Sequence, residues 1–227
     1  MSVVNGGHDN LHSMRFAHNY NAIIVKGILK ELNDGKIMDF GAGDGYFAEK
    51  IGKSSSSTPI CVEPDGIYLD MLEEKGLKAY KSLDDVVEEE FDFIYTLNVL
   101  EHIPDDKAAL FNMRKKLHVG GKIYIFVPAF QVLYGNMDRM LNHVRRYSRK
   151  EALAKVIEAG FKIEKVSYFD SLGFLVAVIH KLLKGSGKLS IKSIRFYDSC
   201  IFPVSCALDL LFSGVFGKNL VIVARAL

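Results

Sequence analysis

The stretch "IMDFGAGDGYF" (residues 37–47) decides the fold, because a short apolar run ends there in three glycines at alternate positions. Glycines that follow a buried strand let the backbone turn sharply and approach a ligand closely. The dinucleotide fingerprint is GxGxxG, whereas Gly41, Gly43 and Gly45 are spaced GxGxG, and bulky Tyr46 stands where the third glycine or alanine would be. The turn therefore predicts a nucleotide or nucleoside site that is not a dinucleotide site.

The acidic residues around this turn indicate the charge of its ligand. Asp44 would lie close to a pyrophosphate and repel it, whereas Asp39 and Asp44 together would suit an ammonium or a sulfonium group. Glu63 ends the next predicted strand, 22 residues after Gly41, where a carboxylate can accept hydrogen bonds from both hydroxyls of a ribose. A nucleoside without phosphates and with a positively charged tail satisfies all three observations. S-adenosylmethionine is such a molecule.

Composition narrows the class of protein. The 227 residues suit one domain, and 49% hydrophobic with 25% charged residues is typical of a globular chain. The 29 basic and 27 acidic side chains nearly balance, so charge does not predict a nucleic-acid partner. Cys61, Cys200 and Cys206 form neither a paired framework nor a CxxC metal motif. The N-terminus lacks the features of a signal peptide, and we expect a cytoplasmic protein.

Short apolar runs alternate with helical patterns along most of the chain, which predicts an α/β fold with a largely parallel sheet and helices on both faces. The expected strands cover residues 36–40, 59–63, 77–81, 91–98, 120–129, 161–169 and 219–226. The expected helices cover residues 10–32, 46–53, 66–75, 104–117 and 149–160.

Two apolar segments interrupt this alternation near the C-terminus. "SLGFLVAVIHKLL" (171–183) is short, and "CIFPVSCALDLLFSGVF" (200–216) is broken by Pro203 and Asp209. Neither supplies the ~20 uninterrupted apolar residues that a membrane-spanning helix needs. We expect amphipathic helices at 171–183 and 191–213 that form a lid over the site, and contact with a membrane surface stays open.

Four segments, in this order, resemble the motifs of the class I S-adenosylmethionine-dependent methyltransferases. They are "MDFGAGDG" (38–45), "VEPD" (62–65), "FDFIYTLNVLEHIPD" (91–105) and "KLHVGGKIYIFVPA" (116–129). The resemblance implies a Rossmann-like, doubly wound, mostly parallel seven-stranded sheet with an antiparallel last strand. It also implies a single domain over residues 1–227, with an N-terminal helix (10–32) and a helical insertion at about 170–217 that acts as a cap.

The resemblance assigns cofactor contacts to four segments of this chain. Around the methionine part it implies Asp39, Gly41, Ala42 and Gly43, and at the ribose Glu63. The remaining implied contacts are Pro64, Asp65, Ser82, Leu83 and Asp84 around the adenine, and Asn98 and Val99 under the methionine and sulfonium. An alternative for Asp84 is the N-cap of a helix in "SLDDVVEEE".

The loop "FQVLYGNMDRMLNHVRRYS" (130–148) follows the predicted fifth strand and should lie over the sulfonium. It resembles the "GHxRRY" segment of a bacterial subgroup that often accompanies sugar or lipid-linked glycan biosynthesis, with Asn142 in place of the glycine. The imidazole of His143 is suited to deprotonate an acceptor. Arg145 and Arg146 are suited to bind a carboxylate or phosphate, and the segment adds Asn142 and Tyr147 to the expected substrate contacts. In the alternative interpretation, Arg146 pairs with Asp138 and His143 caps a helix.

Two further residues are candidates for the reaction. His102, in "LEHIP", is placed to face the acceptor or else packs under the sheet. Tyr20 resembles an aromatic residue that closes over the methionine part in related enzymes, and otherwise belongs to the core. His8, His12 and His18 lack a carboxylate or cysteine at ligand spacing, so we expect no metal.

These observations predict a transferase that methylates an oxygen of a small, anionic or lipid- or sugar-linked metabolite, without a nucleic-acid partner. A first alternative uses S-adenosylmethionine for intramolecular cyclisation or alkyl transfer and releases methylthioadenosine instead of S-adenosylhomocysteine. A second alternative, from another class, is a nucleoside-binding module without catalysis, and an NAD-dependent oxidoreductase comes last.

Overall fold

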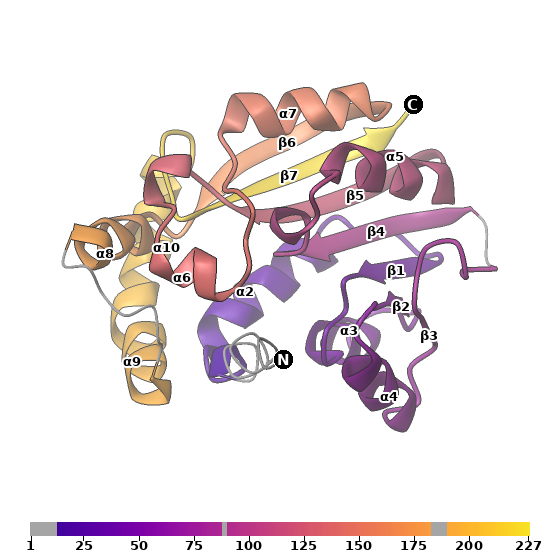
Figure 1. Cartoon of the computed structure of the whole chain (residues 1–227), viewed down its shortest axis with the longest axis horizontal. Helices are drawn as coiled ribbons and strands as arrows, with labels where there is room; N and C mark the ends of the chain where they lie inside the picture. The colour runs from indigo at the N-terminus through magenta and orange to yellow at the C-terminus, as the bar shows by residue number, and fades with distance from the viewer. Residues whose placement is uncertain (1–12, 88–89, 183–189) are drawn as a thin grey trace.

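A seven-stranded sheet crosses the molecule in the order β3–β2–β1–β4–β5–β7–β6 (Figure 1). The computed structural model describes residues 13–87, 90–182 and 190–227. Strands β1 to β5 pair in parallel, and β7 runs antiparallel to both β5 and β6, so the expected sheet and its antiparallel last strand are confirmed. The strands are β1 Ile37–Phe40, β2 Ile60–Val62, β3 Ala79–Tyr80, β4 Phe91–Leu97, β5 Leu117–Pro128, β6 Phe161–Phe169 and β7 Asn219–Ala226.

Helices cover both faces of this sheet because side chains of the long strands alternate between two apolar cores. In β5, Ile123 and Ile125 face the core under α5 and α7, whereas Tyr124 and Phe126 face the core under α2. The helices up to β6 are α2 His18–Leu29, α3 Tyr46–Gly52, α4 Gly66–Glu74, α5 Asp106–Lys116, α6 Asn136–Met140 and α7 Arg149–Glu158. Two 3₁₀ turns, η1 Leu100–His102 and η2 Gln131–Leu133, follow the ends of β4 and β5.

Two predicted helix starts and one predicted cap differ from the structure, each for a local reason. The N-terminal helix α2 begins at His18, after a turn at residues 15 and 16, and residues 10–12 of the predicted span lie outside the described residues. Helix α5 begins at Asp106 because the side chain of Asp105 accepts a hydrogen bond from the Ala108 N–H and caps it. The alternative for Asp84 was wrong, because the chain after β3 forms turns, with Ser82 accepting from the Asp85 N–H.

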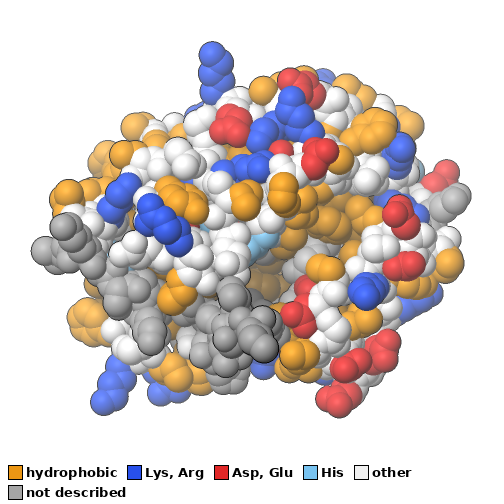
Figure 2. Space-filling model, in the orientation of Figure 1, with side chains coloured by type: hydrophobic (Ala, Val, Ile, Leu, Met, Phe, Trp, Pro, Cys, Tyr) orange, Lys and Arg blue, Asp and Glu red, His pale blue; other side chains and the backbone are white. Residues whose placement is uncertain are grey.

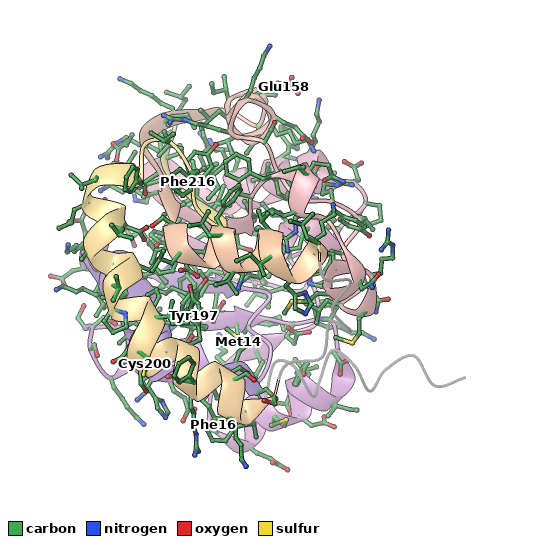
Figure 3. The ribbon with its side chains drawn as sticks, turned by 90° about the vertical axis from the view of Figure 1, so that its left-hand side faces the viewer. Met14, Phe16, Glu158, Tyr197, Cys200 and Phe216 are labelled. Carbon is green, nitrogen blue, oxygen red and sulfur yellow. The ribbon has the colours of Figure 1, made fainter. Side chains whose placement is uncertain are left out.

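The insertion between β6 and β7 contains α8 (Ser171–Leu182), α9 (Ile191–Phe196), the π-helical turn η3 (Tyr197–Ile201) and α10 (Phe202–Phe212). The last three form one helical run that carries Tyr197 and Cys200, and α8 lies across it (Figure 3). Pro203, in the first turn of α10, has no N–H to donate to the preceding turn, which is where the π-helical geometry occurs.

No helix in the described parts of the chain is both long and apolar enough to cross a bilayer. The cytoplasmic location that the N-terminus predicts stays a prediction.

Candidate active site

The glycine turn follows the carboxyl end of β1 and packs closely against Val99, just beyond the end of β4. Gly41 has a φ of +82°, and a Cβ atom there would lie 2.2 Å from Cγ2 of Val99. Only glycine combines this left-handed conformation with so close an approach. The N–H groups of Gly41 and Ala42 both donate to the carbonyl oxygen of Val62, which ties the turn to β2. The turn therefore brings three of the predicted cofactor contacts to one edge of the sheet.

Glu63 lies at the end of β2 and its carboxylate is buried beside the glycine turn. One oxygen accepts a hydrogen bond from the Gly43 N–H at 2.8 Å, and the other accepts from the Asp65 N–H at 3.0 Å. These two bonds tie the end of β2 to the glycine turn and to the start of the next segment. The bonds also fix the carboxylate where the ribose contact is expected.

Asp39 is buried at the end of β1, with only 2% of its surface exposed. Its carboxylate accepts a hydrogen bond from the hydroxyl of Tyr95 at 2.8 Å. Burial raises the pKa of Asp39 from 3.8 to about 8, although the bond from Tyr95 lowers it. A cationic group placed beside this carboxyl would favour its ionised form.

Asp44 was expected to face a cationic ligand, but its partners are cationic groups of the protein itself. Its carboxylate pairs with the guanidinium of Arg15 at 2.5 Å and accepts a hydrogen bond from the Tyr46 N–H. The Lys75 ammonium donates to its main-chain carbonyl at 2.6 Å. These internal cations already balance Asp44, so of the two aspartates at the turn only Asp39 keeps the predicted preference for a positive ligand.

The predicted adenine contacts lie around the ends of β2 and β3. The carboxylate of Asp65 accepts from the Ile67 and Tyr68 N–H groups and so caps α4. Ser82 donates to Asp85, Leu83 packs against the core, and Asp84 is exposed, as is Pro64. Pro64 and Leu83 offer apolar surface, while the polar groups of Asp65 and Ser82 are used within the protein.

Strained backbone marks the same edge of the sheet. Asn98, Phe130 and Asp170 have φ values of 53°, 61° and 66°, and each follows the end of a strand. Left-handed conformations are costly for residues other than glycine and tend to occur at functional sites. The N–H of Asn98 donates to the carbonyl of Phe126, which fixes the loop that leads into η1. The chain thus turns abruptly where the sulfonium is expected.

His143 lies at the centre of a charged cluster beyond this loop. Its Nδ1 is 2.9 Å from the carboxylate of Asp138, which also accepts from Nε of Arg146 at 2.8 Å. Burial alone would raise the pKa of Asp138, but the bonds from His143 and Arg146 hold it below its ordinary value. An ionised Asp138 accepts a hydrogen bond from the Nδ1–H of His143, and in this tautomer the lone pair of the imidazole is on Nε2.

Glu101 and His102 of η1 face this nitrogen. The carboxylate of Glu101 is completely buried, 3.9 Å from Nε2 of His143, and neither of its oxygens has a hydrogen-bond partner among the described residues. Burial raises the pKa of Glu101 to about 8. The ring of His102 meets that of His143 edge to face at 4.7 Å, and removal from water together with this neighbour lowers its pKa. Figure 2 shows histidine surface at the edge of a central hollow.

The architecture and this site agree with a comparison with protein families, in which a family model described as "Methyltransferase domain" matches residues 15–171. The chain belongs to the class I S-adenosylmethionine-dependent methyltransferases. The match begins before α2 and ends at the start of the insertion, so it includes the glycine turn, Glu63 and the loop that carries His143.

Individual relatives of this methyltransferase are distant. The tRNA U34 carboxymethyltransferase of Dichelobacter nodosus is 28% identical over 98 residues, and the match covers 40% of this chain and 31%, about a third, of that protein. A possible histamine N-methyltransferase of Thermotoga maritima has a TM-score of 0.65 at 20% identity, over 94% of this chain and 90% of its own. Geranyl diphosphate C-methyltransferase of Streptomyces coelicolor, in complex with Mg²⁺, geranyl diphosphate and S-adenosyl-L-homocysteine, has a TM-score of 0.64 at 13% identity, over 92% and 80%. The two solved structures establish the fold.

The contacts of the methyltransferase do not support direct substrate binding by two of the predicted residues. Arg146 is buried, and its guanidinium binds Asp138 and the Ala129 carbonyl, as the structural alternative expects. The hydroxyl of buried Tyr147 lies 2.6 Å from the Asp106 carboxylate, to which it donates, and 3.0 Å from the carbonyl oxygen of Leu100.

The other two predicted substrate contacts also have structural roles. Arg145 pairs with Asp106 at 2.6 Å and donates to the Pro104 carbonyl, at the rim of a polar groove of about 620 Å³. Asn142 has a φ of 59°, which explains why it can replace the glycine of the related segment. The alternative interpretation expects His143 to cap a helix, whereas its side chain pairs with Asp138.

Tyr20 is buried in the core, as its alternative interpretation expects, and its predicted role over the methionine part stays a prediction. Its ring packs against Phe169 and Phe202, and its hydroxyl accepts a hydrogen bond from Asn219 at 2.6 Å. The Asp198 carboxylate accepts from its N–H. Tyr20 therefore joins α2 to the insertion.

Sequence reasoning did not single out Glu101 as a site residue. It stands beside His102 in "LEHIP", but nothing in that short segment indicates that the glutamate points inward. Its burial depends on the loop after α6, because the Val144 N–H donates to the Glu101 carbonyl at 2.8 Å and brings His143 alongside. Asp138 entered the prediction only as a structural partner of Arg146, whereas it also orients His143.

Proposed function

We propose that this methyltransferase transfers the methyl group of S-adenosylmethionine to an oxygen atom of a small metabolite that carries a lipid or sugar group. The observation that carries the proposal is the orientation of His143. Asp138 holds Nδ1, which leaves Nε2 directed toward Glu101 and His102. A hydroxyl acceptor needs a nearby group that lowers its pKa or takes its proton, whereas a carboxylate acceptor does not.

The reaction requires alignment more than side-chain chemistry. A lone pair of the acceptor oxygen forms a bond to the methyl carbon while the carbon–sulfur bond breaks and its electrons go to sulfur. The products are the methyl ether, S-adenosylhomocysteine and the proton of the hydroxyl, for which Nε2 of His143 is the proposed base. Asn98 and Val99 lie only two to three residues before Glu101, which supports an acceptor between the sulfonium and this cluster.

The surface of the insertion supports a lipid-linked acceptor. We propose that α8, α9 and α10 form a cap beside the acceptor loop, where the Lys181 ammonium donates to the Val132 carbonyl. Several large apolar side chains of this cap are exposed, among them Leu175, Ile179, Leu182, Phe196, Leu210 and Leu211. Its acids face inward, since Asp198 is buried and Asp209 accepts from the Asp170 and Ser171 N–H groups.

The exposed charges that remain on the described part of the cap are basic. Lys181, Lys192 and Arg195 are exposed. Exposed apolar side chains beside basic ones suit contact with an anionic membrane surface, where a lipid-linked metabolite would be found.

Product analysis tests the proposal. The enzyme would be incubated with S-adenosylmethionine labelled on the methyl group and with separate extracts of polar metabolites, lipids and total tRNA. We expect S-adenosylhomocysteine and a labelled lipid-extract product that survives mild base, as an ether does and a methyl ester does not. Methylthioadenosine would support the alternative reaction, and labelled tRNA would contradict the acceptor class. No turnover with any extract would favour a binding module.

A further inference from the structure

Three side chains that can ligate a metal meet at the carboxyl edge of the sheet. Glu101 and His102 come from η1, and His143 follows α6, 41 residues after His102 (143 − 102). One ligand atom from each lies within 4.8 Å of the other two. We propose that Glu101, His102 and His143 bind a single first-row divalent ion, with zinc as the preferred ion.

The buried carboxylate of Glu101 is the first argument for a ligand. The side chain has no exposed surface, and neither oxygen has a hydrogen-bond partner in the part of the chain that the structure describes. Buried polar groups in folded proteins are nearly always partnered, because an unpaired one loses its bonds to water without replacement. Nε2 of His143 is 3.9 Å from a carboxylate oxygen of Glu101, too distant for a hydrogen bond. A cation between them would bind both.

The support behind His143 is the second argument. Asp138 binds Nδ1 of His143 at 2.9 Å, and Arg146 fixes Asp138 at 2.8 Å. A histidine that ligates a metal commonly donates its other ring nitrogen to a carboxylate, which fixes the ring and makes the free nitrogen a better ligand. The Val144 N–H, which donates to the Glu101 carbonyl, holds the two ligand segments together. The ligands are thus oriented before an ion arrives.

The distances allow an ion after a small closure. Two ligands with metal bonds of about 2.1 Å in tetrahedral geometry lie about 3.4 Å apart. The separation of 3.9 Å between Nε2 of His143 and Oε1 of Glu101 would therefore contract by about half an ångström, and the pairs with His102, which lie within 4.8 Å, by at most about 1.4 Å. His102 is exposed, so an ion can reach this ligand from solvent.

The ligand set selects the kind of ion. Two imidazole nitrogens and one carboxylate oxygen suit zinc or a neighbouring first-row ion, whereas magnesium and calcium prefer oxygen ligands. Three protein ligands leave an open position, which is typical of catalytic sites. The role of the ion rests on the proposed function but changes its base. When Nε2 of His143 binds the ion, that nitrogen no longer takes the proton; the ion would instead lower the pKa of the acceptor hydroxyl, whose proton would pass to solvent. Binding of the ion itself does not depend on that function.

Direct binding measurements on the chelator-treated, full-length protein test the inference without cofactor or acceptor. We expect wild type to bind one zinc ion per chain by calorimetry, and cobalt to give the visible absorption of a nitrogen- and oxygen-ligated ion. Glu101→Gln and His143→Gln should each weaken zinc binding by on the order of tenfold to 100-fold. Magnesium should not compete.

Two control variants separate this site from adventitious binding. His118→Gln removes a histidine that pairs with Asp92 away from the site, and His8→Gln with His12→Gln removes two N-terminal histidines. Zinc binding should survive in both controls. Loss of binding in either control, with binding retained in Glu101→Gln, would overturn the inference, as would the absence of zinc binding by wild type.

The outcomes also distinguish this inference from the proposed function. Unaltered circular dichroism and thermal unfolding of Glu101→Gln would show that the variant folds, and His102→Gln, at the exposed ligand, provides a second variant. If the protein binds no zinc but methylates a hydroxyl, the metal site fails and the proposed function stands. If zinc binds as expected but no methylated product forms, the proposed function fails and the metal site stands.

Discussion

The cofactor side and the acceptor side of this methyltransferase are built in different ways. On the cofactor side, backbone N–H groups of one glycine turn and the carboxylates of Asp39 and Glu63 follow directly from the ends of β1 and β2. On the acceptor side, Glu101 and His102 meet Asp138 and His143 from a loop after α6. The first side is determined by short segments of chain, and the second by how distant segments pack.

This difference has a functional consequence. Proteins with different acceptors can keep the same proposed cofactor side, because its glycine turn and carboxylates are placed by the ends of parallel strands. The acceptor side depends on a few side-chain atoms, such as Nε2 of His143, and on the surface of the insertion. Substitutions on the two sides should therefore separate turnover from cofactor affinity.

The largest effect is expected from His143→Gln. Losing the group that acts on the acceptor hydroxyl should lower kcat by on the order of 10²–10⁴-fold. The affinity for S-adenosylmethionine should stay unchanged, because His143 contacts Asp138 and η1 but not the glycine turn. Release of S-adenosylhomocysteine gives the rate, and calorimetry gives the affinity. His118→Gln is the matched control; equal losses of rate and affinity in His143→Gln would contradict the separation of the two sides.

Glu63→Ala should have the complementary effect. Hydrogen bonds to a charged group contribute about 1.5–3 kcal/mol, so affinity for S-adenosylmethionine should fall by about tenfold to 150-fold. Loss of the acceptor for the Gly43 N–H adds to this effect by loosening the turn. Glu73→Ala, an exposed position on the adjacent helix α4, serves as the control. Unchanged calorimetric affinity would remove Glu63 from the cofactor site.

The same contrast explains how much of the molecule could be predicted. Strands and helices followed from alternating patterns and glycine turns, and so did the positions of Asp39 and Glu63 at the ends of β1 and β2, while their contacts with a cofactor stay predictions. Asp44 was misjudged, because its partner Arg15 lies 29 residues earlier, in a turn before α2 where a helix was predicted. The core contacts of Tyr20 could not be predicted, since Phe169 and Phe202 come from β6 and the insertion, far along the chain.

The affinity for S-adenosylmethionine should depend on pH through Asp39. Burial raises the pKa of this carboxyl to about 8 in the free protein, and a bound ammonium would lower it, so binding near neutrality should release a proton. Affinity should therefore rise as the pH increases from 6 toward 8, by at most tenfold per unit. Calorimetry in buffers of different ionisation enthalpy measures the proton. In Asp39→Asn the proton release from this site should disappear; an unchanged release would assign it elsewhere, for instance to the amino group of the ligand.

The smallest effect concerns the surface of the insertion. Leu210 and Leu211, at the end of α10, are 86% and 75% exposed, so their substitution should not disturb the core. In Leu210→Glu with Leu211→Glu, two negative charges replace apolar surface, and binding to anionic phospholipid vesicles should fall several-fold in a sedimentation assay while cofactor affinity stays unchanged. Val119→Glu, at a 78% exposed position in β5, adds charge away from the insertion and should leave vesicle binding close to wild type. Equal vesicle binding by all three proteins would show that the exposed apolar side chains do not contact a membrane, and would leave the acceptor side without its proposed link to lipids.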